Sequence, residues 1–125
     1  MSRQSSPRLA RVYDGRDGDG RPHADRVAVD PGVLDAVLTY LEAAPVVLAA
    51  RGFDVDEFAP RERDVPLNFR TDGEWVWAGS VPHYLRKYGL PPEPDLLAHI
   101  ADRGFRIGEV AEAAKDRAVE LVIGG

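Results

Sequence analysis

Apolar residues recur at helical spacing after Asp30-Pro31, where an acidic N-cap precedes a proline at the first helical position. The spacing predicts an amphipathic helix from about Pro31 to Ala43. Pro45 ends this helix. The continuous apolar run Val46 to Ala50 follows it and is typical of a buried strand, which Arg51-Gly52 closes.

Three more helices are predicted in the last third of the chain. Ser80 can cap the first of them, and Gly89 supplies its stop. Pro94 opens the next one, which ends before Gly104. The last runs from about 107 to 121, and its spacing predicts four buried residues: Val110, Ala114, Ala118 and Leu121.

Weaker patterns surround these elements. Two short strands are expected near the N-terminus, over Leu9 to Tyr13 and Ala24 to Val29, and they can pair with each other. The acidic stretch 53–64 reads as irregular, with Phe53 and Phe58 folded back onto the core.

The loop between the early strands invites a calcium interpretation, because Asp17 and Asp19 precede Gly20 much as in an EF-hand. The match fails at two ligand positions. Gly15 stands where the first ligand belongs, and Arg26 stands where a bidentate glutamate belongs. Glycine and aspartate here indicate a solvated turn.

The segment Val65 to Gly79 contains both tryptophans and an Asp72-Gly73 turn between two apolar runs, which predicts a β-hairpin. A two-residue turn would place Asn68, Arg70, Trp75 and Trp77 on one face, with Arg70 opposite Trp75. That face could bind a partner, because arginine and aromatic side chains are favoured anchors. A three-residue turn would instead bury the tryptophans beside Leu67 and Phe69. Both registers remain open from the sequence.

The order of these elements predicts a single α+β domain over 1–125, with residues 1–7 flexible. It is expected to have a small, mainly antiparallel sheet with a central β-hairpin. About four helices are expected, mostly on one face of that sheet.

The composition of the chain excludes several kinds of site and binding partner. The chain has 125 residues, a net charge of -5 and no cysteine, which excludes disulfides and thiolate metal sites. The acidic balance argues against binding to nucleic acid or to an anionic membrane, but it suits a basic protein partner. The sequence shows no signal peptide and no membrane-spanning run, so a cytoplasmic protein is expected.

Candidate chemistry is sparse. The three histidines, His23, His83 and His99, have no metal-ligand spacing, and no glycine-rich loop cradles a phosphate. Ser80 and His83 could meet at a helix start, but Ser80 is better explained as a cap. The sequence therefore predicts no catalytic residue, no metal and no cofactor.

The segments FRTDGEWVW and SVPHYLRKYGLPPEPDLLAHI, together with the upstream APVVLAARGFD, resemble a group of small uncharacterised actinobacterial proteins. The resemblance spans roughly residues 30–103. Proteins of this kind resemble the small cytoplasmic partners that accompany secreted toxins. The resemblance implies that Arg70, Asp72, Gly73, Trp75 and Trp77 define the fold or its surface, and it carries over no catalytic residue.

Two main functional hypotheses follow. The first is a non-enzymatic protein-interaction module, of the immunity or antitoxin type, which would bind a partner through Arg70, Asp72, Trp75 and Trp77. The alternative is a small enzyme or ligand-binding domain with an aromatic–arginine pocket around Arg70, Trp75 and Trp77, extended by Tyr84 and His83. A self-associating structural subunit is a third possibility.

Overall fold

The computed structural model describes residues 7–124, so the predicted flexibility of residues 1–7 falls almost entirely outside the described part. Its strands are β1 Arg8–Leu9, β2 Gly15–Arg16, β3 Pro22–His23, β4 Val46–Asp54, β5 Val65–Thr71 and β6 Trp75–Ala78. Its helices are α1 Leu34–Ala43, α2 Ser80–Tyr88, α3 Pro94–Asp102 and α4 Glu112–Gly124.

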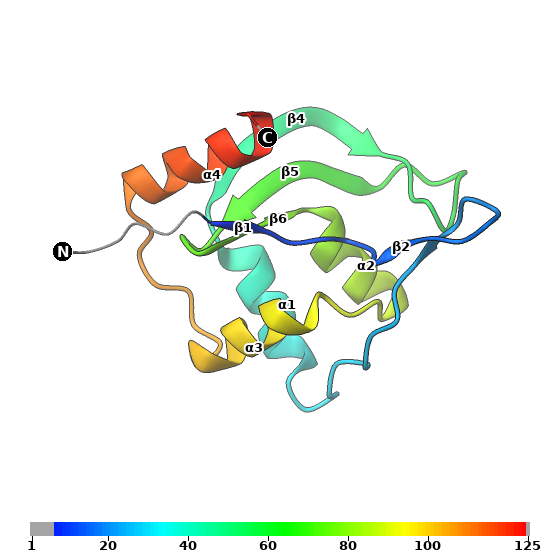
Figure 1. The fold of residues 1–125 in the computed structure, drawn as a ribbon, viewed down its shortest axis with the longest axis horizontal. Coiled ribbons are helices and arrows are strands. Elements are labelled where there is room, and N and C mark those ends of the chain that lie inside the picture. The colour runs from blue at the N-terminus through cyan, green and yellow to red at the C-terminus, as the bar shows by residue number, and fades with distance from the viewer. Residues whose placement is uncertain (1–6, 125) are drawn as a thin grey trace.

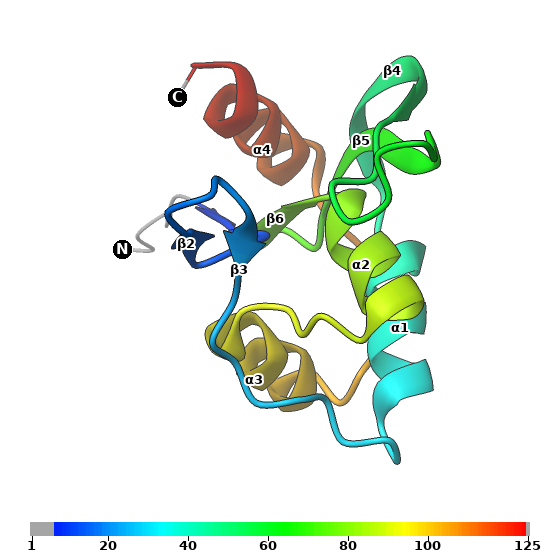
Figure 2. The same cartoon turned by 90° about the vertical axis from the view of Figure 1, so that its right-hand side faces the viewer.

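The predicted α+β class is confirmed. One sheet has the order β1-β6-β5-β4, and β5 runs antiparallel to both of its neighbours. Only β1 is parallel, alongside β6, while β2 and β3 form a separate two-stranded ribbon. Helices α1, α2 and α3 lie on one side of the four-stranded sheet and α4 lies on the other (Figures 1 and 2). The hairpin β5–β6 is at the centre, as predicted.

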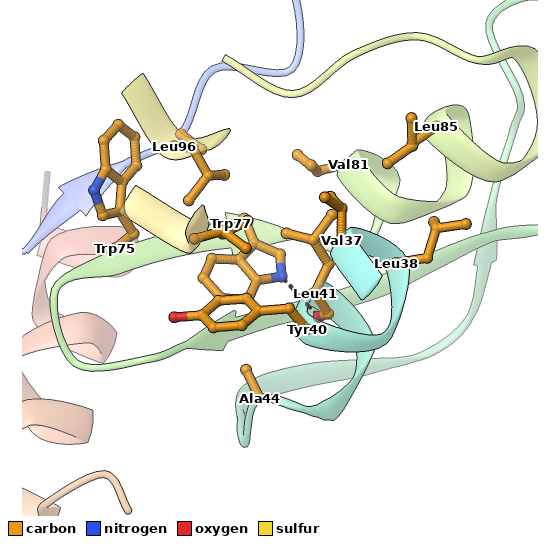
Figure 3. Packing of buried hydrophobic residues seen from close by; sticks show 12 residues of the cluster. Val37, Leu38, Tyr40, Leu41, Ala44, Trp75, Trp77, Val81, Leu85 and Leu96 are labelled. Atoms are coloured by element: carbon orange, nitrogen blue, oxygen red, sulfur yellow. Dashed lines mark hydrogen bonds between the residues drawn. The ribbon is translucent and has the colours of Figure 1, made fainter. Parts of the chain in front are cut away.

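The main core lies between the sheet and helices α1, α2 and α3. Trp77 is fully buried there, and Figure 3 shows its ring beside Tyr40 of α1. Their ring centroids are 6.1 Å apart. Apolar side chains from all three helices complete this core: Val37, Leu38, Leu41, Val81, Leu85, Leu96 and Ile100. Burial of this apolar area is the main stabilising contribution to the fold.

The hairpin turns later than Asp72-Gly73. Arg70 pairs with Trp77 and Thr71 with Val76, so the turn is centred on Gly73 and Glu74. Gly73 has a φ of 102°, a conformation that side chains with a Cβ rarely adopt. Arg70, Trp75 and Trp77 share one face, as in the two-residue alternative. That face is the one that α1, α2 and α3 cover.

Helix α4 begins five residues later than expected. Gly108 lies in the predicted first turn, where its conformational freedom disfavours a helix. Ala114 and Ala118 are buried as predicted, whereas Val110 and Leu121 are only half-buried. The Ala114 Cβ and a Val110 methyl group lie 3.8 Å from the position that a Cβ on Gly73 would take, so the helix starts against the hairpin turn.

The N-terminal predictions need correction. The first strand is shorter than Leu9 to Tyr13 and pairs with β6, and residues 24–29 form no strand. The reason is Arg26, whose nearly buried guanidinium donates to the carbonyls of Arg11, Val12 and Pro91. Side-chain hydrogen bonds thus attach this segment in place of a strand ladder.

Two further expectations, for Ser80 and Phe53, differ from the structure. Gly79, not Ser80, is the N-cap of α2, and Ser80 is the first helical residue. Phe53 is 53% exposed and does not fold back onto the core, whereas Phe58, although 44% exposed, packs onto the buried Tyr84 as predicted. Phe53 lies in β4 because that strand continues to Asp54, and Phe58 packs on the rim against Tyr84.

Candidate functional site

The predicted binding residues Arg70, Asp72, Trp75 and Trp77 come together in space, but mainly inside the protein. Trp75 and Trp77 are 5% and 0% exposed, and the Asp72 side chain is fully buried. Arg70 alone is half-buried. The two tryptophan rings therefore do not line an open pocket.

Arg70 and Trp77 donate hydrogen bonds to backbone carbonyls at the C-terminal end of α1. Pro45 has no N–H, so the Leu41 carbonyl lacks its ordinary helical donor. The indole Nε1 of Trp77 donates to that carbonyl at 2.9 Å. The Arg70 guanidinium donates to the Ala44 carbonyl at 2.5 Å, where a cation also suits the helix dipole. The arginine and the tryptophan of the hairpin are thus explained by their hydrogen bonds to the C-terminal end of α1.

Asp72 is a buried hydrogen-bonding hub at the hairpin turn. Its Oδ1 accepts the backbone N–H groups of Glu74 and Trp75 at 2.9 and 2.8 Å. Its Oδ2 accepts the Tyr40 hydroxyl at 2.5 Å and lies 2.6 Å from Nε2 of His99. The carboxylate therefore holds the turn and ties it to α1 and α3.

Asp56, in the loop between β4 and β5, repeats this arrangement. Its Oδ1 accepts the backbone N–H groups of Phe58 and Ala59 at 2.8 and 3.1 Å. Its Oδ2 lies 3.0 Å from both Nε2 of His83 and the Tyr88 hydroxyl of α2. Two loops of the protein are thus each built on one fully buried aspartate with a histidine and a tyrosine.

The electrostatics of both hubs follow from these contacts. Burial by itself raises the pKa of Asp56 and of Asp72. Hydrogen bonds outweigh that effect: those from His83 and the Phe58 N–H at Asp56, and those from Tyr40 and the Trp75 N–H at Asp72. The pKa of each carboxyl is therefore held below its usual range, and both are ionised at neutral pH.

Acid is expected to unfold the protein through these two carboxylates. Their contribution to stability is complete above the ordinary aspartate pKa of about 4 and is lost as the pH falls through the depressed native values. The free energy of unfolding should therefore drop steadily below about pH 4. Urea denaturation across a pH series measures this, and Asp56→Asn should show a shallower dependence. An unchanged slope in that variant would contradict the assignment.

Lys87 neutralises the acidic surroundings of Asp56. Its Nζ lies 3.1 Å from Asp56 Oδ2, 2.9 Å from Glu62 Oε2 and 3.0 Å from Asp64 Oδ2. The hydrogen bond to Glu62 is the largest cause that raises the pKa of Lys87 above its ordinary value. Asp56, Asp64 and His83 offer ligand atoms within 4.8 Å of one another, so a metal ion would have to compete with this ammonium.

Lys87→Met should convert this cluster into a zinc-responsive one. The change leaves three carboxylates without their cation, so the Tm is expected to fall. Zn²⁺ accepts imidazole and carboxylate ligands, and it should raise the Tm of this variant and leave the wild type unchanged. Thermal unfolding with and without Zn²⁺ measures the difference. The double variant Lys87→Met/His83→Ala is the control and should not respond; an equal response of the wild type would refute the competition.

These contacts limit the chemistry that the histidines can perform. In residues 7–124 no hydrogen bond joins Ser80 to His83, and His83 instead faces Asp56 and Asp64. Both ring nitrogens of His99 face carboxylates, Nε2 toward Asp72 and Nδ1 toward Glu74 at 3.2 Å. Each of these two imidazoles thus holds a loop to a helix through a buried aspartate.

An open apolar surface lies at the outer edge of the sheet. Val46 and Phe53 of β4 are 44% and 53% exposed, although both are large apolar residues. Beside them is a pocket of about 390 Å³, lined by residues of β4, β5 and the end of β6 that include Leu48, Ala50, Leu67, Phe69 and Ala78. We call this surface the β4 margin. Sequence reasoning missed it because it read Val46 to Ala50 as a buried strand.

Comparison with protein-family models, curated proteins and solved structures finds no match to this chain. None of the helices in residues 7–124 combines the length and apolar character needed to cross a bilayer.

Proposed function

We propose that this chain is a non-enzymatic protein-interaction module, an immunity- or antitoxin-like protein that binds and neutralises a basic partner toxin in the cytoplasm. The observation that carries the proposal is the β4 margin. Large exposed apolar side chains beside an apolar pocket are typical of a surface that another protein covers.

The use of the ionisable residues supports the same conclusion. Asp56, Asp72, His83 and His99 are all engaged in hydrogen bonds that hold loops to helices. An inhibitor needs a complementary surface and a stable framework, and it needs no reactive group. A net charge of -5 would also speed the encounter with a basic partner.

The test is affinity capture of the tagged full chain from its native host at about 0.15 M salt. We expect one partner at stoichiometric yield, with a basic isoelectric point. Expression of that partner alone should then stop growth of a test strain, and co-expression of this chain should restore growth. Failure to capture a stoichiometric partner, or a captured partner that is harmless, would count against the proposal.

A further inference from the structure

We infer that the open edge of β4 accepts an extended segment of a partner protein as an added strand, and that the adjacent pocket receives one large apolar side chain of that segment. This inference rests on the proposed function and specifies how the partner is bound.

The first observation is the edge itself. Among the strands of residues 7–124, β4 is the outermost one of its sheet and pairs only with β5 (Figure 1). In residues 7–124, no backbone hydrogen bond joins Val46–Asp54 to any other element. An edge strand presents a row of unpaired N–H and C=O groups, and another extended backbone is the group that matches this row.

The second observation is the light protection of this edge, which is limited to bulges in β4 and to the packing of α4 against that strand. Soluble proteins blunt edge strands with lysine, proline, β-bulges or a covering element. Within Val46–Asp54 there is no lysine or proline, and Arg51 is the only charge before the final Asp54. The pairing of β4 with β5 shifts register twice, once between Val46 and Leu48 and once between Ala49 and Phe53. The second shift is a bulge in which residues 50–52 lie opposite Leu67 alone, with Gly52 at a φ of 82°.

The pocket beside β4 would select which side chain the added segment carries. Its lining includes Leu48 before the bulge, Ala50 within it and Asp54 after it, together with Leu67 and Phe69 of β5. In strand addition, main-chain hydrogen bonds give affinity and side-chain pockets give specificity. A volume of about 390 Å³ is large enough for an aromatic or branched side chain.

Charge favours a partner's segment over a second copy of this chain. Each copy carries a net charge of -5, so two copies repel one another. Asp54 is exposed, ends β4 and lines the pocket, and it would attract a lysine or arginine of the added segment. The occupant is therefore an extended apolar segment with a basic flank.

The experiment selects peptides from a random twelve-residue display library against the full-length chain. Enriched peptides are then synthesised, and their Kd is measured by fluorescence anisotropy. We expect alternating apolar residues, one large apolar anchor and a basic flank. Val46→Lys and Ala50→Trp should each weaken binding by about tenfold or more. Val27→Lys is the matched control, because Val27 is 87% exposed near α1 and α3, and it should leave the Kd unchanged.

N-methylation of the peptide backbone separates strand addition from other binding. Methyl groups on alternate amides along one peptide edge should abolish binding, and those on the other edge should leave it intact. No enriched peptide, equal Kd values for all three variants, or self-association of the chain that occupies β4 would overturn the inference. If a captured partner protein still binds Val46→Lys and Ala50→Trp normally, strand addition fails while the interaction function stands.

Discussion

Asp72→Ala is expected to lower the free energy of unfolding by about 3–5 kcal/mol, because breaking a buried charge network leaves its other members unpaired. The substitution removes the acceptor for two backbone N–H groups, the Tyr40 hydroxyl and the His99 ring. This loss is a large share of the stability of a domain of this size. Urea denaturation monitored by circular dichroism measures it.

The matched control is Asp102→Ala, which removes an exposed aspartate at the end of α3 and should change stability by less than about 0.5 kcal/mol. If Asp72→Ala were as mild as this control, the Asp72 hub would contribute no net stability and would not hold the hairpin turn.

Trp77→Ala is expected to have an effect of similar size, about 3–5 kcal/mol. The substitution leaves a cavity between the sheet and α1, and it removes the donor that satisfies the Leu41 carbonyl. The loss should be visible as a lower denaturant midpoint in urea.

Phe53→Ala is the control for Trp77→Ala, because it removes an aromatic side chain that is 53% exposed on β4. Its effect on the unfolding of the free chain should be well under half as large. Equal losses in the two variants would contradict the distinction between the core and the β4 margin.

Local sequence signals predicted most of the framework. Proline and glycine marked the ends of α1, α2 and α3 because they act on the backbone of their own segment. The shared face of Arg70, Trp75 and Trp77 followed from strand alternation. The pattern could not show that helices cover this face, since that depends on contacts between α1 and β6, more than 30 positions apart.

The contacts of the two aspartate hubs could not be predicted from the sequence either, because they also join residues that are far apart in the chain. An aspartate that accepts N–H groups two and three residues later forms a turn that sequence can suggest at Asp56 and Asp72. Their partners His83 and His99 lie 27 positions away in each case. The edge position of β4 also depends on the strand order of the whole sheet, so a run of apolar residues looked buried when it is partly exposed.

The β4 margin is a surface available for binding. The two aspartate hubs belong to the framework that holds the shape of the molecule. Asp56, Asp72 and their histidines stabilise the loops at the ends of β4 and β5, and they keep these strands in place. Partner binding is therefore expected to depend on the β4 margin, and the stability of the free chain on the two aspartate hubs. The two can be tested separately.

The most direct test of the central claim is hydrogen–deuterium exchange of the full chain with and without its captured partner. We expect new protection to concentrate in 46–54 and in the adjoining part of β5, with little change around His83 and His99. Protection centred on either histidine, with β4 exchanging as fast as in the free chain, would contradict it.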